Sequence, residues 1–439
     1  MDRSNRGAVR RLAGRFQRRL TYTALVAVSL AAGGCDVLDK ALDVDAPGLV
    51  DAGDMSNPEN AALLVNGVIA DFECALGAYI VNSALLGNEL RDASVTAARF
   101  PLDQRTIDDS SPYGVNSCAG NPPGIYRPLA TAIWTSNNAL SLLGGWTDAE
   151  VADRTDLIAQ AAAYSGYSHV LMGEGFCSAV IVENGPEVQA QQVFEAAEAR
   201  FTTAIDAAQA SGNTDILNLA RLGRARARLN LGDLGGAAAD ARALLASDPT
   251  YEKVATASVA SSRRWNRVGD EFLGGRVTVD SSYRGLTVDG VPDPRVEIID
   301  TGTRGHDSAT PVFIAAKYGE ERTAALREVP VPVATWREAH LIIAEAEGGQ
   351  EAVDRINILR SHWGLPAYAG GTAAEIQQQV IEERARELYL EGHHLNDLRR
   401  FNLPNTPSVG APYRQGGFYG DVRCFELPAV ERENNPNVG

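Results

Sequence analysis

The stretch VFEAAEARFTTAIDAAQASGNTDILNLARLGRARARLNLGDLGGAAADARALLASDP, residues 193–249, decides the fold. Its apolar and small residues recur at helical spacing in three runs, and Leu231-Gly232-Asp233 makes the last turn between them. The runs are Phe194, Ala197, Phe201, Ala204 and Ile205; Leu219, Ala220, Gly223 and Ala227; and Ala237, Ala241 and Leu244. Small residues at these positions let helices pack closely, as in tetratricopeptide pairs. We therefore predict tetratricopeptide-like helices over 193–249, with a generic alanine-rich hairpin as the alternative.

Helical patterning extends through most of the remaining chain, so the sequence predicts a mainly α protein. Between the helices, residues 250–332 hold short β-prone runs and turns, which predict an irregular insert with a few short strands. Residues 401–439 are rich in Pro, Gly and Asn and are expected to wrap over the surface as a tail. Further helices are expected after the cap Asn57-Pro58-Glu59, over about 78–90, from 129, over 148–177, and within 335–400, where the last runs unbroken from 373 to about 400.

The first 35 residues have the pattern of a bacterial lipoprotein signal. Seven arginines between Arg3 and Arg19 precede an apolar run over 20–32, and Gly33-Gly34-Cys35 follows. This apolar run is too short for a typical spanning helix. We predict a signal peptide over 1–34, acyl chains on Cys35 that anchor the protein to a membrane, an acidic tether over 35–58 and one folded body over 59–439. An ordinary secretory signal with an incidental cysteine is the alternative.

Charge and cysteine content narrow the class of partner. The net charge is −16, and removing residues 1–34 takes away seven arginines and one aspartate, which gives −16 − 6 = −22. A protein with this much negative charge repels nucleic acid and anionic lipid, whereas neutral or cationic ligands remain possible. Beyond Cys35, four cysteines remain, an even number that favours two disulfides in an exported chain, with three pairings possible. These four are Cys74, Cys118, Cys177 and Cys424. No two of them stand two to four residues apart, so a zinc site is disfavoured.

Several short motifs follow one another in the second half of the chain. They are Asp293-Pro294-Arg295; Lys317-Tyr318; Trp336-Arg337-Glu338-Ala339 through Ala344-Glu345-Ala346; Arg355-Ile356-Asn357-Ile358-Leu359-Arg360 with Gly364-Leu365-Pro366; Glu383-Arg384 through Glu387-Leu388, Glu391-Gly392-His393 and Asp397-Leu398-Arg399-Arg400; and Leu427-Pro428 with Glu431 and Asn435-Pro436-Asn437. In their order, and together with the lipoprotein signal and the helical repeat, they resemble the SusD/RagB family of outer-membrane nutrient-binding lipoproteins.

The resemblance implies a scaffold of about four tetratricopeptide-like pairs whose loop-rich inserts form the ligand surface. It also implies a partner, a TonB-dependent outer-membrane barrel of the SusC type. A member of this family captures glycans, or sometimes peptides, at the cell surface and releases them into the barrel. It catalyses nothing and needs no cofactor.

Sugar binding requires aromatic faces beside amides or carboxylates. Loop-like sequence supplies seven candidates: Tyr113, Tyr126, Trp265 and Tyr283 for the aromatic faces, and Asn116, Asn121 and Asp109 for the polar contacts. For each aromatic the alternative is local loop packing. The other tryptophans lie on or beside predicted helices and are expected in the core or at helix ends; they are Trp134, Trp146, Trp336 and Trp363.

The carboxylates Glu383, Glu387 and Glu391 recur every four residues and are interpreted as helix-surface ion pairs with nearby arginines. His393 and Asp397 are expected to share a helix face, but two ligands are too few for zinc. The sequence contains no phosphate loop or GxSxG elbow, so no catalytic residue is predicted. Two other classes remain open: a tetratricopeptide envelope lipoprotein that acts as a protein-binding scaffold, and a glycoside hydrolase with paired carboxylates.

Overall fold

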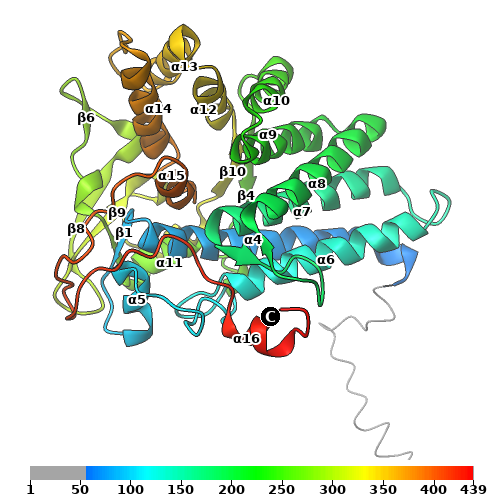
Figure 1. The fold of residues 1–439 in the computed structure, drawn as a ribbon, viewed down its shortest axis with the longest axis horizontal. Coiled ribbons are helices and arrows are strands. Elements are labelled where there is room, and N and C mark those ends of the chain that lie inside the picture. The colour runs from blue at the N-terminus through cyan, green and yellow to red at the C-terminus, as the bar shows by residue number, and fades with distance from the viewer. Residues whose placement is uncertain (1–55, 439) are drawn as a thin grey trace, which may run out of the picture. The chain divides into compact units, whose positions relative to one another are not determined.

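The computed structural model describes residues 56–438, which form one compact unit (Figure 1). The predicted signal peptide, Cys35 and most of the predicted tether lie outside the described residues. The fold is mainly α, as predicted. Its helices are α4 (Ala61–Leu86), α5 (Phe100–Gln104), α6 (Tyr126–Gly145), α7 (Arg154–Gly175), α8 (Ala190–Ser211), α9 (Thr214–Leu231), α10 (Leu234–Ser247), α11 (Arg267–Gly274), α12 (Trp336–Glu347), α13 (Gly349–His362), α14 (Ala373–Glu387), α15 (His394–Arg400) and α16 (Ala429–Asn434).

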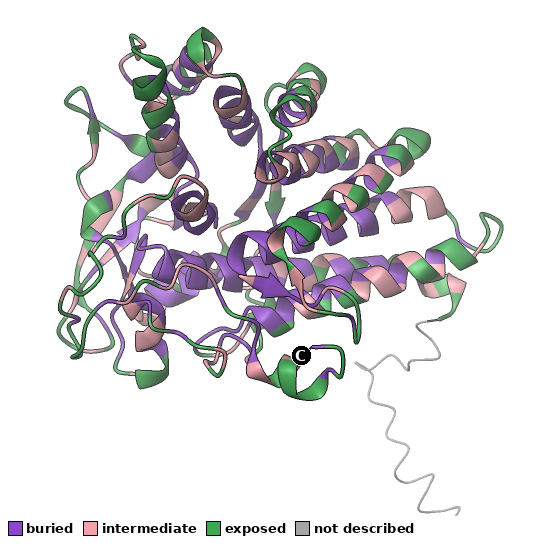
Figure 2. Ribbon diagram, viewed as in Figure 1, coloured by how far each residue is buried: buried purple, intermediate pink, exposed green. Residues whose placement is uncertain are grey.

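The scaffold is a row of helices in which each packs against its neighbour in the sequence. α4 contacts α6 and α7, α7 contacts α8, and the row continues through α9 and α10 to α12, α13 and α14. In Figure 1 the long helices α4, α6, α7 and α8 lie side by side, and α12 to α15 form a second group beside α10. Figure 2 shows the buried residues concentrated where these helices face one another. Sequential packing of this kind is typical of tetratricopeptide arrays.

Close packing within the repeat depends on Phe201 of α8. Its fully buried ring lies between Gly166 of α7 and Gly223 of α9, and it meets the Tyr167 ring edge to face with 5.1 Å between centroids. A Cβ on Gly223 would lie 2.2 Å from Cζ of Phe201, and a Cβ on Gly166 would lie 2.6 Å from its Cε1. Gly223 within the repeat and Gly166 in the helix before it therefore make room for one aromatic ring.

Short strands pair as antiparallel two-stranded ribbons between the helices. Within 56–438 the pairs are β1 (Leu90–Asp92) with β5 (Val277–Val279), β2 (Ser178–Ala179) with β3 (Val188–Gln189), β4 (Glu252–Ala255) with β10 (Val331–Thr335), β6 (Thr287–Val288) with β7 (Val291–Pro292), and β8 (Ile298–Arg304) with β9 (Pro311–Ala315). Most of them lie in 250–332, where the sequence is rich in turns.

Two helix predictions were wrong. The segment before residue 91 forms the single helix α4 and not two helices, because residues 61–86 carry apolar or small side chains on nearly every side and the second half of α4 is buried all round. This stretch is also long and apolar enough to span a membrane, but more than half of the tested window is buried in the protein, as for a core helix. The expected helix over 373–400 is broken into α14 and α15, because Leu390 and Gly392 adopt φ of 55° and 86°, which an α-helix does not allow.

The predicted carboxylate ridge is buried, which corrects its assignment to the surface. Glu383 accepts hydrogen bonds from Arg295, at 2.5 Å, and from Arg360, and Glu387 accepts one from Trp363 Nε1 at 3.0 Å. Burial raises the pKa of Glu387 to about 7. These contacts join α14 to α13 and to the segment at Asp293-Pro294-Arg295, so the ion pairs hold the interior of this group of helices together.

His393, just before α15, and Asp397, within α15, also have arginine neighbours. His393 Nε2 lies 3.2 Å from Nη1 of the buried Arg226, and Asp397 accepts hydrogen bonds from Arg384 and Arg400. Burial and the nearby arginines lower the pKa of His393. Within the described residues, no group of His, Cys, Asp and Glu side chains has the arrangement of a metal site.

The two predicted disulfides are present. Cys74 of α4 pairs with Cys118, and Cys177, just after α7, pairs with Cys424. The second bond fixes the C-terminal tail beside Phe176, where Cys177 and Phe425 are also in backbone contact: the Cys177 N–H donates to Phe425 O at 2.9 Å. The tail therefore returns to the end of α7, close to the turn between β2 and β3.

Candidate functional site

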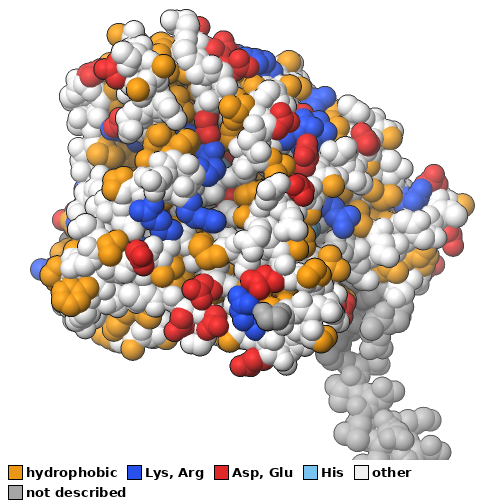
Figure 3. Space-filling model, viewed as in Figure 1, with side chains coloured by type: hydrophobic (Ala, Val, Ile, Leu, Met, Phe, Trp, Pro, Cys, Tyr) orange, Lys and Arg blue, Asp and Glu red, His pale blue; other side chains and the backbone are white. Residues whose placement is uncertain are grey.

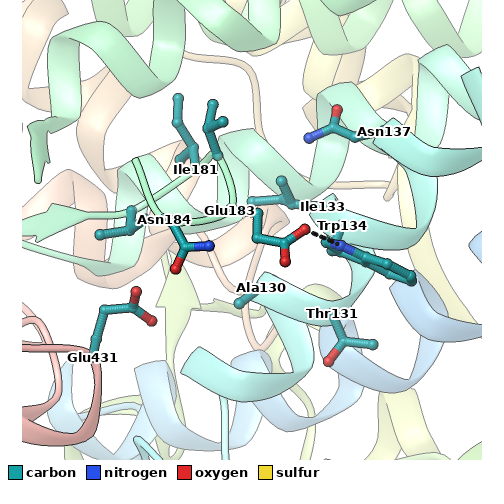
Figure 4. Close-up of a pocket in the computed structure, with 11 residues that line it drawn as sticks. Ala130, Thr131, Ile133, Trp134, Asn137, Ile181, Glu183, Asn184 and Glu431 are labelled. Atoms are coloured by element: carbon teal, nitrogen blue, oxygen red, sulfur yellow. Dashed lines mark hydrogen bonds between the residues drawn. The ribbon is translucent and has the colours of Figure 1, made fainter. Parts of the chain in front are cut away.

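A pocket of about 320 Å³ opens between α6, the turn between β2 and β3, and α16 (Figure 4). Its lining consists of Ala130, Thr131, Ile133, Trp134 and Asn137 from α6, Val180, Ile181, Val182, Glu183 and Asn184 from the turn, and Glu431 from α16. The pocket thus combines an aromatic ring, apolar side chains, two amides and two carboxylates. None of the eleven lining residues is a lysine or arginine.

Trp134 is half-exposed, with 50% of its surface accessible, and this is the reverse of what the sequence analysis expected. The buried face of α6 carries Leu129, Ile133, Ser136 and Leu143, and a rotation of 100° per residue places Trp134 almost opposite to it. Its indole N–H donates to Glu183 Oε2 at 3.0 Å. This hydrogen bond joins α6 to the β2–β3 turn and fixes the orientation of the ring.

The amides of the pocket have donors and acceptors to spare. Asn137 accepts a hydrogen bond from Arg200 at 2.7 Å through Oδ1, while its Nδ2 has no partner among the described residues. The Asn184 side chain likewise has no hydrogen-bond partner within 56–438, although its backbone O accepts one from Asn437. Figure 4 shows Asn184 and Glu431 across the pocket from Trp134. The ring therefore shares the pocket with polar groups that are free to bond a ligand.

The C-terminal tail holds the β2–β3 turn in place. Arg432 of α16 pairs with Glu187 at 2.9 Å, and Asn435 Nδ2 donates to Gly185 O at 2.8 Å. A hydrogen bond from Ser178, together with the Arg432 charge, lowers the pKa of Glu187. Because α16 also supplies Glu431, residues more than 290 positions apart in the sequence form one pocket.

Tyr126, one of the residues predicted from sequence, lies beneath this pocket. Its ring is buried against Phe176, with 5.4 Å between centroids. Its hydroxyl lies beside Glu431 and the Val180 backbone but makes no well-aligned hydrogen bond to either. Burial and the Glu431 carboxylate raise the pKa of Tyr126 far above its ordinary value. Tyr126 is therefore not a lining residue, and its buried ring has no open face for a ligand.

The structure spreads the other predicted residues over several places. Tyr113 is buried against Phe425 and donates to Glu426 O at 2.9 Å. Tyr283 is buried and stacks on Tyr389 with 4.5 Å between centroids. Rings so enclosed present no open face in this structure.

The remaining predicted residues are more accessible. Trp265 is half-buried, and the Arg327 guanidinium covers it 3.9 Å from the ring centroid. Asn121 is exposed and accepts from Arg99, Asn116 donates to Pro122 O, and Asp109 is half-buried. None of these four lines the Trp134 pocket. Their contact with a ligand stays a prediction.

Comparison with known proteins identifies a family for this chain. The model of the SusD family matches residues 337–427, which include α12 to α15 and the start of the tail. The chain belongs to the SusD/RagB family. No curated protein matches its sequence.

Solved structures share the fold over nearly their whole length. A SusD superfamily protein from Bacteroides vulgatus aligns with a TM-score of 0.68 at 14% identity, covering 88% of this chain and 98% of that one. A SusD-like carbohydrate-binding protein from the same organism gives 0.65 at 16% identity, with 87% and 97% covered. Another SusD-like carbohydrate-binding protein, from Bacteroides fragilis, gives 0.64 at 15% identity, with 87% and 99% covered. Such low identities carry the SusD fold and not the details of a site.

Proposed function

We propose that this SusD/RagB family member binds oligosaccharides and that the Trp134 pocket is where a sugar ring rests. The carrying observation is the accessible Trp134 ring, held by Glu183 and flanked by the amides of Asn137 and Asn184. An indole face covers the C–H face of a pyranose, and amides and carboxylates bond its hydroxyls. Among the residues predicted from sequence, four stay proposed contacts outside this pocket: Trp265, Asn116, Asn121 and Asp109.

We further propose that the protein is an outer-membrane lipoprotein, anchored through Cys35, that delivers its ligand to a SusC-like TonB-dependent transporter. Family membership and the lipoprotein signal at the start of the chain support this proposal. Pull-down from outer membranes tests it, with recovery of a large barrel protein as the expected result. Recovery of soluble envelope proteins without a barrel would favour the scaffold alternative instead.

The proposed activity is binding without cleavage. A glycosidase needs one carboxyl group kept protonated by an apolar, water-poor environment. Glu183 is exposed and accepts the hydrogen bond of Trp134, which is not such an environment. Release of reducing ends from any bound glycan would contradict this part of the proposal.

Affinity electrophoresis against a polysaccharide panel tests the binding site. The chain carrying Cys35→Ser, which cannot be acylated at that position, should be retarded by at least one glycan. Trp134→Ala should abolish most of that retardation, because loss of stacking on one aromatic costs about 1–3 kcal/mol in comparable ring contacts. Trp146→Ala, at the end of the same helix and outside the pocket, is the matched control and should bind normally. Equal retardation of the two variants would contradict the assignment.

A further inference from the structure

The charge of the Trp134 pocket points to a narrower ligand class. Two of its lining residues, Glu183 from the β2–β3 turn and Glu431 from α16, carry carboxylates (Figure 4). No lysine or arginine is among the lining residues. A sugar that sits on Trp134 therefore shares the pocket with two acidic groups.

The nearest cations do not neutralise these carboxylates. Arg200, which is not among the lining residues, donates to Asn137, and Arg432 pairs with Glu187 at 2.9 Å. Arg127 lies one helical turn before Thr131 on α6, outside the lining. Glu183 accepts its hydrogen bond from the neutral indole of Trp134 and forms no ion pair within the described residues.

The overall charge of the chain is acidic as well. The chain has 40 basic against 56 acidic residues. In Figure 3 acidic and basic side chains are scattered among neutral and apolar areas over the face in view. The local charge of the pocket therefore adds to an acidic background, and both disfavour an anionic ligand.

We propose that the Trp134 pocket selects against acidic glycans and accepts neutral sugars or sugars that carry amino groups. This inference rests on the proposed function and deepens it. A uronic acid or sulfate on the bound ring would be placed near Glu183 and Glu431 and repelled by them. A protonated amine at the same place would be attracted. Surface charge pairs change affinity by about threefold each, so two carboxylates give about a tenfold discrimination at low salt.

Two chemical forms of one polymer, with the same linkages but with primary hydroxyls or carboxylates, test the proposal whatever the glycosidic linkage. The probe is the neutral polysaccharide that retards the Cys35→Ser chain most strongly, used alongside its own derivative with primary hydroxyls oxidised to carboxylates. We expect about tenfold weaker binding of the oxidised form, and a difference that shrinks as salt is added. The double variant Glu183→Gln with Glu431→Gln should bind the oxidised and neutral forms with affinities within about twofold of each other.

A matched control separates pocket charge from overall charge. Glu320→Gln with Glu321→Gln also removes two negative charges, but from exposed residues that lie outside the pocket lining. This double variant should discriminate between oxidised and neutral polymer as the wild type does. Equal affinity of the wild type for oxidised and neutral polymer, or equal relief in both double variants, would overturn the charge proposal while leaving glycan binding intact. Failure to bind any polysaccharide would overturn the proposed function as well.

Discussion

Replacing Gly223 by alanine tests how the scaffold is packed. The added Cβ would lie 2.2 Å from Cζ of Phe201, whereas carbon atoms in contact normally keep about 3.5–4.0 Å. The ring cannot retreat toward α7, because Gly166 already lies against its other side. Overpacking of this kind costs about 1–3 kcal/mol, while alanine gains about 1 kcal/mol of helix propensity over glycine. We therefore expect a net loss of up to about 2 kcal/mol in unfolding free energy.

Urea unfolding followed by circular dichroism measures this loss. Gly235→Ala in α10 is the matched control, because nothing lies within 4 Å of its added Cβ. The control should be as stable as the wild type or more stable by up to about 1 kcal/mol. Phe201→Leu in the Gly223→Ala background should recover part of the loss, since leucine lacks the ring atoms Cε1 and Cζ that meet the added Cβ. A Gly223→Ala protein at least as stable as the control would refute the packing argument.

Two further predictions concern buried groups. Burial raises the pKa of Glu89 to about 8 from the ordinary 4.5, so the folded protein holds this proton where the unfolded chain releases it. The unfolding free energy should therefore fall as pH rises from about 4.5 to 8. In Glu89→Gln, which keeps the acceptor for the Leu390 N–H, the unfolding free energy should fall less over the same range. Urea unfolding of both proteins at several pH values measures this, and equal slopes of unfolding free energy against pH would contradict the prediction. The Cys177–Cys424 disulfide closes a longer loop, with a separation of 247 against 44 for Cys74–Cys118. Loop entropy predicts that the two disulfides stabilise the fold by about 5 and about 4 kcal/mol respectively. Cys177→Ser with Cys424→Ser should therefore lower the unfolding free energy more than Cys74→Ser with Cys118→Ser. The reverse order of stability in urea unfolding would contradict this prediction.

The repeat could be predicted from sequence because its information is local. Helical spacing, the Gly232-Asp233 turn and Gly223, which packs against Phe201, all lie within 193–249, and the structure places α8, α9 and α10 there. The end of α14 at Glu387 could not be predicted from local sequence in the same way. Apolar spacing continues past it to Leu395, and the break comes from the positive φ of Leu390 and Gly392.

The candidate site was missed for a physical reason that differs between its parts. Trp134 could have been found, since the helical period places it opposite the buried face of α6; expecting a tryptophan on a helix to be core was the error. Glu431 could not have been found, because contact between α16 and the β2–β3 turn depends on a tail that returns across the fold. The burial of Tyr113 has the same origin, for its hydroxyl donates to Glu426, 313 residues away.

The most direct test of the account is a crystal structure of the protein with the oligosaccharide that it binds most tightly. The account predicts a pyranose ring stacked on the open face of Trp134, with hydroxyls bonded to Asn137 or Asn184 and no acidic substituent between Glu183 and Glu431. A complex in which the glycan occupies another surface and leaves the Trp134 ring uncovered would contradict it.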